Sequence, residues 1–163
     1  MQAMARAIFW ADSPSFDENT RLEAANIMKD EQQLLSCFGA ELTFGTGGLR
    51  GVLGVGTNRM NQYTVGRATQ GLADYMKQTG GKSVAIAYDS RLRSDEFAHI
   101  AAGILANNGI KAFVYPRLMP TPMLSFAVRH LGCDAGIVIT ASHNPAQYNG
   151  YKVYWTDGAP MPP

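Results

Sequence analysis

The feature that most constrains the fold of this chain is a regular alternation between helical and extended patterns from residue 65 to residue 155. Apolar residues recur at helical spacing in three segments, which predicts helices over about 65–79, 94–108 and 121–131. Runs of β-forming residues predict strands over 83–88, 110–115, 135–140 and 151–155. Strands that alternate with helices form a largely parallel sheet that is covered on both faces. The sequence therefore predicts an α/β fold, a three-layer α/β/α sandwich with a mostly parallel mixed sheet.

Capping and stop signals mark the ends of these predicted helices. Gly80-Gly81 ends the first helix, and Gly132 ends the third. Ser94 is the expected N-cap of the second helix, and Thr121-Pro122 supplies a cap and a first-turn proline for the third.

The first 40 residues have a weaker pattern than the rest of the chain. Ser15 and Glu18 fit a capping box, which predicts a mostly polar helix that runs to about Leu35. We therefore expect a peripheral N-terminal helical arm over 1–40 and one domain over 41–163. The last residues, DGAPMPP, are typical of the start of a linker, so we expect a fragment of a longer multidomain protein.

Composition narrows the classes of partner. The 163 residues are 46% hydrophobic and 17% charged, with a formal net charge of +1, which is typical of a globular domain. A nearly neutral chain is not expected to bind nucleic acid or an anionic membrane. No apolar run is long enough to cross a membrane, and Cys37 and Cys133 suggest buried, reduced thiols, so a cytoplasmic location is expected.

Residues 138–152 read VITASHNPAQYNGYK and place chemically active side chains directly after a predicted buried strand. Ser142 and His143 follow the β-forming residues, and Lys152 comes after an intervening turn. The segment 89–91, Asp-Ser-Arg, follows another predicted strand. Because the carboxyl ends of parallel strands meet at one edge, where ligands bind, we expect these groups to lie at the same edge of the sheet.

A glycine-rich segment, FGTGGLRGVLGVG at 44–56, can bring its backbone close to a ligand. It carries Arg50, a planar donor suited to phosphate. The strand-end Ser142 and His143, with basic donors at Arg50, Arg91, Arg93 and Lys152, favour phosphoryl transfer, in which positioning and charge neutralisation carry most of the catalysis.

Other motifs do not hold up. The segment GGKS at 80–83 lacks the earlier glycine of a P-loop and lies between a helix and a strand, in the wrong order. The segment GTG at 45–47 has Arg50 where the third glycine of a dinucleotide fingerprint belongs. Ser142 lacks the flanking glycines of a hydrolase elbow. A serine acyl hydrolase and a non-catalytic binding or assembly module remain as alternatives.

Two segments resemble motifs of the α-D-phosphohexomutase superfamily. TASHNP at 140–145, followed by NGYK at 149–152, resembles the active-serine loop of that family, and FGTGGLRG at 44–51 resembles its N-terminal substrate loop. The chain is identified over roughly residues 40–163 as similar to the family's N-terminal domain, domain I. Two further segments resemble the phosphoglucomutase and phosphopentomutase branch in particular, NRMN at 58–61 and ATQGL at 68–72.

The resemblance implies roles for individual residues. Ser142 would be the phosphoserine that donates a phosphoryl group to the sugar phosphate, and a Mg²⁺ ion would bind through its phosphate. Lys152 matches the family lysine implicated in proton transfer, and His143 lies beside the serine in the same catalytic loop. The substrate-binding residues implied are Thr46, Arg50, Arg91, Ser142 and Lys152.

The implied reaction is that of an isomerase, an intramolecular phosphotransferase. It would interconvert glucose 1-phosphate and glucose 6-phosphate through a bisphosphate intermediate, with Mg²⁺ as cofactor and glucose 1,6-bisphosphate as primer. Phosphopentomutase and phosphomannomutase activities remain alternatives within the family. The family's metal loop and its sugar and distal-phosphate loops do not occur in this chain. We therefore expect the chain to need the remaining domains of its own protein and to be inactive by itself.

Overall fold

The structure, a computed structural model, describes residues 1–45 and 48–161. Six helices are seen in this part of the chain: α1 (Gln2–Asp12), α2 (Glu18–Ile27), α3 (Glu31–Phe38), α4 (Gln62–Thr79), α5 (Ser94–Asn107) and α6 (Thr121–Leu131). The strands there are β1 (Leu49–Val52), β2 (Ser83–Tyr88), β3 (Lys111–Val114), β4 (Ala135–Ile139) and β5 (Tyr148–Trp155).

The strands form one mixed sheet in the order β1-β5-β4-β2-β3. Strand β2 is parallel to both β3 and β4, and β5 is antiparallel to both β1 and β4. Four strands therefore point the same way, and β5 alone runs against them. It does so because a short loop, with no helix, joins β4 to β5, and a connection of that length can only turn the chain back.

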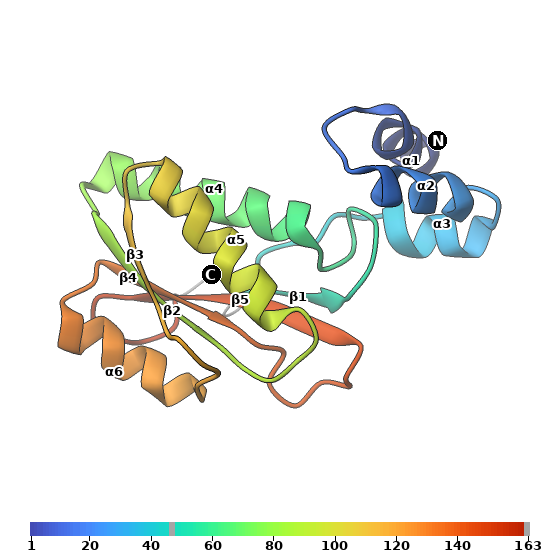
Figure 1. Cartoon of the computed structure of the whole chain (residues 1–163). Coiled ribbons are helices and arrows are strands. Elements are labelled where there is room, and N and C mark those ends of the chain that lie inside the picture. Colours follow the sequence, from blue (N-terminus) through green and yellow to red (C-terminus); the bar gives the residue numbers. More distant parts are fainter. Residues whose placement is uncertain (46–47, 162–163) are drawn as a thin grey trace.

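The helices cover both faces of this sheet, with α4 and α5 on one face and α6 on the other (Figure 1). Alternate side chains of each strand feed the two layers. Val84 and Ile86 of β2 enter the core under α4 and α5, whereas Ala85 packs toward α6. A Cβ on Gly136 would lie 2.5 Å from Val128 Cγ2, so this glycine lets α6 approach β4 closely. The predicted three-layer α/β/α sandwich is confirmed.

The predicted C-terminal ends of α4 and α6 are found, whereas the predicted Thr121 cap was wrong, because Pro120 is the N-cap of α6. Gly80 and Gly132 have left-handed φ values of 83° and 63° and end α4 and α6 as predicted. The Ser94 cap was wrong, because Arg93 is the N-cap of α5 and Ser94 is its first helical residue. The hydroxyl of Ser94 is buried and donates to Asp89 Oδ1 at 2.8 Å, so it connects two segments instead of capping a helix.

The chain before β1 forms three helices instead of the one predicted, and we call α1–α3 the helical arm. The capping box at Ser15 and Glu18 was wrong: Asp17 is the N-cap of α2, and its carboxylate accepts from the Thr20 amide at 3.0 Å. The arm has its own apolar cluster, which includes Trp10 and Phe38. Figure 1 shows the arm beside β1 and the start of α4.

The arm is attached to the sheet domain by aromatic and polar contacts. Tyr63 of α4 packs against Trp10 and Phe16, with ring centroids 5.4 Å and 4.7 Å away, and its hydroxyl donates to Asp17 Oδ2 at 2.7 Å. Arg59 donates to the Ser36 carbonyl oxygen at 2.7 Å. These contacts join α1 and the segment before α2 to the first turn of α4, and α3 to the segment between β1 and α4.

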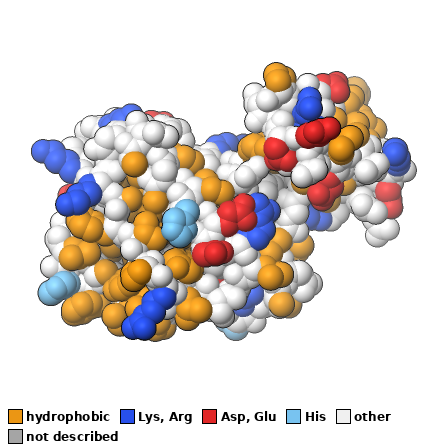
Figure 2. Space-filling model, in the orientation of Figure 1, with side chains coloured by type: hydrophobic (Ala, Val, Ile, Leu, Met, Phe, Trp, Pro, Cys, Tyr) orange, Lys and Arg blue, Asp and Glu red, His pale blue; other side chains and the backbone are white. Residues whose placement is uncertain are grey.

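The surface has a mixed character. Acidic and basic side chains are interspersed on the face in Figure 2, in keeping with the net charge of +1, and hydrophobic side chains gather near β3 and α6. Cys37 and Cys133 are buried and unpaired, as predicted. Within residues 1–45 and 48–161, no helix has the length and apolar character required for a membrane crossing.

Candidate active site

Ser142 lies in the loop between β4 and β5, residues 140–147, which we call the serine loop. The side chain is exposed, and the backbone has a φ of 57°, in the left-handed region. Its amide donates to Thr140 Oγ1 at 2.9 Å. A residue other than glycine rarely adopts this conformation, and such strained residues concentrate at functional sites. The strand end therefore presents the serine hydroxyl to solvent on a sharply turned backbone.

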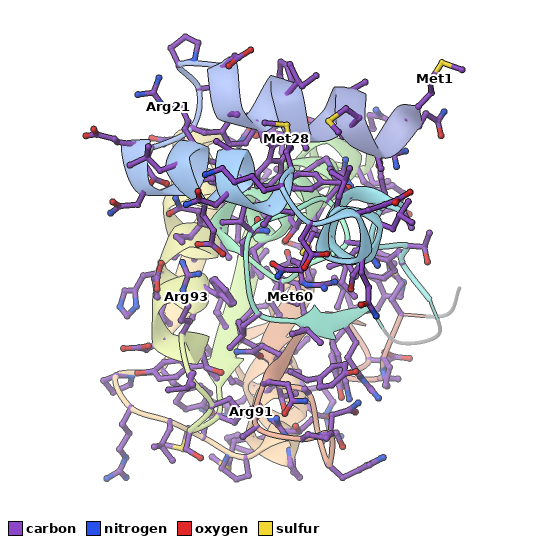
Figure 3. The ribbon with its side chains drawn as sticks, turned by 90° about the vertical axis from the view of Figure 1, so that its right-hand side faces the viewer. Met1, Arg21, Met28, Met60, Arg91 and Arg93 are labelled. Carbon is purple, nitrogen blue, oxygen red and sulfur yellow. The ribbon has the colours of Figure 1, made fainter. Side chains whose placement is uncertain are left out.

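The segment after β2, residues 89–93, lies against the serine loop, and we call it the β2 loop. Because β2 and β4 are parallel neighbours, both loops leave the sheet at the same edge, as the sequence predicted. The guanidinium of Arg91 donates to the carbonyl oxygen of Ser142 at 2.7 Å. In Figure 3, Arg91 lies at the end of the molecule away from Met1 and Met28 of the helical arm.

A cavity of about 460 Å³ opens between the two loops, and polar groups of both loops line it. Its volume is within the range of small-ligand sites. The lining residues are Asp89, Ser90, Arg91, Leu92, Ser142, Asn144 and Ala146.

Arg50 reaches the serine loop from the other side. It lies on β1, opposite Gly150 of β5, and its Nη1 donates to Asn144 Oδ1 at 2.9 Å. A Cβ on Gly150 would lie 2.6 Å from the Thr140 carbonyl oxygen and 2.9 Å from that of Leu49. Glycine at this position therefore lets β1, β5 and the serine loop come close enough for the Arg50 contact.

Lys152 lies inside the sheet on β5, paired with Val138 of β4. Side chains alternate between the two faces of a strand, so Lys152 points to the face opposite Tyr151. Arg50 pairs with Gly150, two residues before Lys152, and therefore lies on the same face as Lys152. Burial lowers the pKa of the Lys152 ammonium, and the positive charge of Arg50 lowers it further. Within the described part of the chain no hydrogen bond joins Lys152 to Ser142, so its role in proton transfer stays a prediction.

The remaining candidate residues are less tightly placed. His143 is exposed, with its Nδ1 3.4 Å from Ser142 Oγ, the long end of hydrogen-bond distance. Thr46 lies outside the described residues. Among residues 1–45 and 48–161, no carboxylate hydrogen-bonds to His143, whereas a hydrolytic triad needs an acid to orient its histidine.

The described residues do not by themselves form a Mg²⁺ site. No group of three or more histidine, cysteine, aspartate or glutamate side chains within them could hold a metal ion. The nearby carboxylate, that of Asp89, accepts from the Arg91 amide and from the Ser94 hydroxyl at 3.0 Å and 2.8 Å. A phosphate on Ser142 would supply one kind of ligand, whereas Mg²⁺ requires near-octahedral oxygen coordination.

Two asparagines of the site had no role assigned from the sequence. Asn144 receives the Arg50 hydrogen bond, and Asn149 is completely buried while its Nδ2 donates to the Leu92 carbonyl oxygen at 3.0 Å. The turn pattern around Asn149 could only suggest a loop residue. Its contact with the β2 loop depends on how the two loops meet in space.

The chain is thus a three-layer α/β/α domain that presents an exposed serine on a strand-end loop, between Arg50 of β1 and Arg91 of the loop that follows β2. The chain belongs to the phosphoglucomutase/phosphomannomutase family, as its alpha/beta/alpha domain I: residues 41–163 match that family.

Individual relatives agree with this assignment. The chain is 51% identical over 125 residues to a phosphoglucomutase of Staphylococcus haemolyticus, covering 76% of this chain and 23% of the relative. It is 43% identical over 153 residues to a Schizosaccharomyces pombe protein named "Probable phosphoribomutase", covering 90% of this chain and 26% of that relative. A crystal structure from Thermus thermophilus, assigned in its name to the phosphomannomutases, has a TM-score of 0.70 at 38% identity. The match covers 75% of this chain and 27% of that structure. The chain spans about a quarter of the length of these relatives.

Proposed function

We propose that this chain is the nucleophile-bearing domain I of a phosphosugar mutase that interconverts glucose 1-phosphate and glucose 6-phosphate. The observation that carries the proposal is Ser142, exposed in a left-handed conformation at the carboxyl edge of the sheet, within a loop that Arg50 and Arg91 both contact. Membership in the phosphoglucomutase/phosphomannomutase family supports the same function.

The proposed reaction passes a phosphoryl group between Ser142 and the sugar. The bond from phosphorus to Ser142 Oγ breaks while a bond from phosphorus to a sugar hydroxyl oxygen forms. Lys152 takes the proton of that hydroxyl and passes it to the serine oxygen, and its lowered pKa favours the required loss of a proton. The second half of the reaction runs in reverse with the other phosphate of the bisphosphate, so Ser142 is phosphorylated again.

Arg50 is proposed to offset negative charge on the phosphate as it moves. Its guanidinium lies beside the serine loop on the same face of the sheet as Lys152, and a planar fork of N–H donors suits phosphate oxygens. His143 is proposed to orient the Ser142 hydroxyl, from which its Nδ1 is 3.4 Å away. Thr46 is proposed as a further substrate contact on the basis of the family resemblance.

We further propose that Mg²⁺ binds to the phosphate of Ser142, with its other ligands supplied from outside this chain, and that it offsets phosphate charge. Glucose 1,6-bisphosphate is the proposed primer, and the cytoplasm is the proposed location. The N-terminal helical arm, residues 1–40, and domain I, residues 41–163, are proposed to work with the remaining domains of a longer protein. Residues 1–163 alone should then show no mutase turnover.

The test uses the longer protein that contains this chain. After exposure to glucose 1,6-bisphosphate, mass spectrometry should find one added phosphate on Ser142, and Ser142→Ala should abolish both the phosphate and the turnover. Ser15→Ala is the matched control, because Ser15 is an exposed serine of the helical arm that does not line the cavity beside Ser142, and it should keep both. Phosphate on another residue, with Ser142→Ala fully active, would overturn the proposal.

A second candidate is a phosphopentomutase. The relative named as a phosphoribomutase aligns with 90% of this chain, against 76% for the phosphoglucomutase, so its similarity reaches further into the chain. Values of kcat/KM for glucose 1-phosphate, ribose 1-phosphate and mannose 1-phosphate would decide between the candidates. A preference for ribose 1-phosphate would replace glucose in the proposal and leave the role of Ser142 unchanged.

A further inference from the structure

Arg91 directs its guanidinium toward the serine loop and donates to four backbone carbonyl groups, three in that loop and one at the start of β5. Nη2 donates to Ser142 and Asn144, each at 2.7 Å, and Nη1 donates to Pro145 at 3.0 Å and to Tyr148 at 3.1 Å. The two terminal nitrogens of an arginine carry four N–H groups in a fixed plane. All four are therefore used within the protein.

The fifth donor of Arg91 faces its own loop. Nε lies 3.5 Å from Asp89 Oδ2, and the other carboxylate oxygen accepts from the Arg91 amide at 3.0 Å and from the Ser94 hydroxyl at 2.8 Å. The Arg91 side chain is only 14% exposed. To bind a substrate phosphate, Arg91 would have to give up hydrogen bonds that it makes within the protein.

A second set of contacts fixes the frame that holds this arginine. Buried Asn149 donates from Nδ2 to the Ser94 hydroxyl and to the Leu92 carbonyl oxygen, each at 3.0 Å. Its Oδ1 accepts from the Gly150 amide at 2.8 Å. The start of β5 is thus bonded to the β2 loop, and the β2 loop holds Arg91 across the serine loop.

The carbonyl oxygens that Arg91 holds belong to the strained residue itself and to three residues that follow it in the chain. Ser142 has a φ of 57°, and its own carbonyl oxygen is one of the acceptors. A strained backbone persists only where the surroundings determine it more than once. Apart from Arg91, the bond from the Ser142 amide to Thr140 Oγ1 restrains this turn from the strand side.

We infer that Arg91 is a positioning residue, which holds the serine loop in the conformation that presents the Ser142 hydroxyl, and that it does not bind the substrate. Arg91 was expected from the sequence to bind substrate, and its contacts favour this different role. The part of the inference that concerns turnover rests on the proposed mutase function. The part that concerns the order of the loop does not.

Arg91→Lys separates the two roles, because lysine keeps the positive charge but cannot donate to four carbonyl groups in one plane. Arg91→Ala removes both. Arg129→Ala is the matched control, since Arg129 lies on α6 and makes one backbone contact, to Ser125. Melting temperatures are measured for every variant. If Arg91→Ala does not fold, Arg91→Lys decides the outcome.

Hydrogen exchange of residues 140–149 in the 163-residue chain reports loop order directly. Losing hydrogen bonds to a charged group should speed exchange of these amides about 10- to 100-fold in both Arg91 variants, with no change in Arg129→Ala. In the longer protein that contains this chain, both Arg91 variants should lower kcat about 10- to 100-fold, because a misplaced reacting group costs rate, and should change KM less than about threefold.

Each contrary result has a distinct meaning. Unchanged exchange of residues 140–149 in both Arg91 variants would overturn the inference about the loop. A raised KM with normal kcat in Arg91→Lys would overturn it in favour of substrate binding. A wild-type protein without mutase turnover would refute the proposed function, while the exchange experiment would still decide whether Arg91 orders the loop.

Discussion

Gly150→Ala should destabilise the chain for a purely steric reason. Gly150 lies on β5 between β1 and the end of β4, and its φ is not in the left-handed region, so alanine is acceptable to the backbone itself. The added Cβ would lie 2.6 Å from the Thr140 carbonyl oxygen, whereas ordinary contacts begin at 3.4 Å, so the neighbouring backbone must retreat by about 0.8 Å.

The magnitude follows from the backbone that must move. The Thr140 amide donates to the Gly150 carbonyl oxygen at 3.0 Å, so a retreat strains a ladder bond at the base of the serine loop. Forcing a group into a well-packed site costs about 1–3 kcal/mol. With a urea m-value of about 2 kcal/mol/M, the midpoint of unfolding should fall by about 0.5–1.5 M.

Urea unfolding followed by circular dichroism measures this change, and Gly71→Ala is the control. Gly71 is inside α4, and an added Cβ there meets nothing within 4 Å. Alanine in place of glycine inside a helix stabilises by about 0.5–1 kcal/mol, so the control should shift the midpoint in the opposite direction. A Gly150→Ala chain as stable as wild type would refute the steric reasoning.

Charged side chains give three further predictions. Arg50→Ala should remove about 1.5–3 kcal/mol of transition-state stabilisation, measured as a fall in kcat/KM, with little change in melting temperature. Unchanged kinetics would contradict the role of Arg50. Lys152→Met should lower kcat more than it raises KM. Because burial and Arg50 disfavour the charged lysine, the melting temperature of this variant at pH 7 should not fall below that of wild type. The hydroxyl and amide of Thr20, together with the hydroxyl of Tyr63, lower the pKa of Asp17 from 3.8 to about 2, so the ionised carboxylate stabilises the fold above pH 3.8. Melting temperatures between pH 4 and pH 2 should therefore fall more in wild type than in Asp17→Asn, and equal falls would contradict this.

The layers of the fold could be predicted because strands and helices leave different periodicities in the sequence. Val84 and Ile86 belong to one face and Ala85 to the other, and this alternation survives in the folded sheet. The arm was harder to predict. In α1, the buried Ala3, Ala7 and Trp10 have helical spacing, but three apolar residues do not predict a helix until the helices that pack against them are known.

The choice of cap shows a second limit. Ser15 and Asp17 are both good N-caps by residue type, and only Asp17 also meets Tyr63, which comes from α4. Similarly, Ser94 has the residue type of a cap, yet its hydroxyl bonds to Asp89. Propensity ranks residues for local roles, and contacts distant in sequence decide among them.

The site divides in the same way. That Ser142 and Arg91 would meet at one edge could be predicted, since it depends only on two strands being parallel. That Arg91 would donate to backbone carbonyl groups could not be predicted, because the residue type equally suits a phosphate. The left-handed backbone of Ser142 was also missed, since it depends on where the loop returns to the sheet.

The antiparallel β5 has a consequence for the order in which the site forms during folding. Strands β4 and β5 and the serine loop make one hairpin, whose pairing joins residues close in sequence, such as Ile139 and Tyr151. The two arginines arrive from much further away, since Arg50 is 94 positions from Asn144 and Arg91 is 51 positions from Ser142. Contacts between distant residues carry the larger loop-closure entropy. We therefore expect the hairpin with Ser142 and Lys152 to form early, and the serine to acquire its ordered conformation only when the whole sheet has assembled.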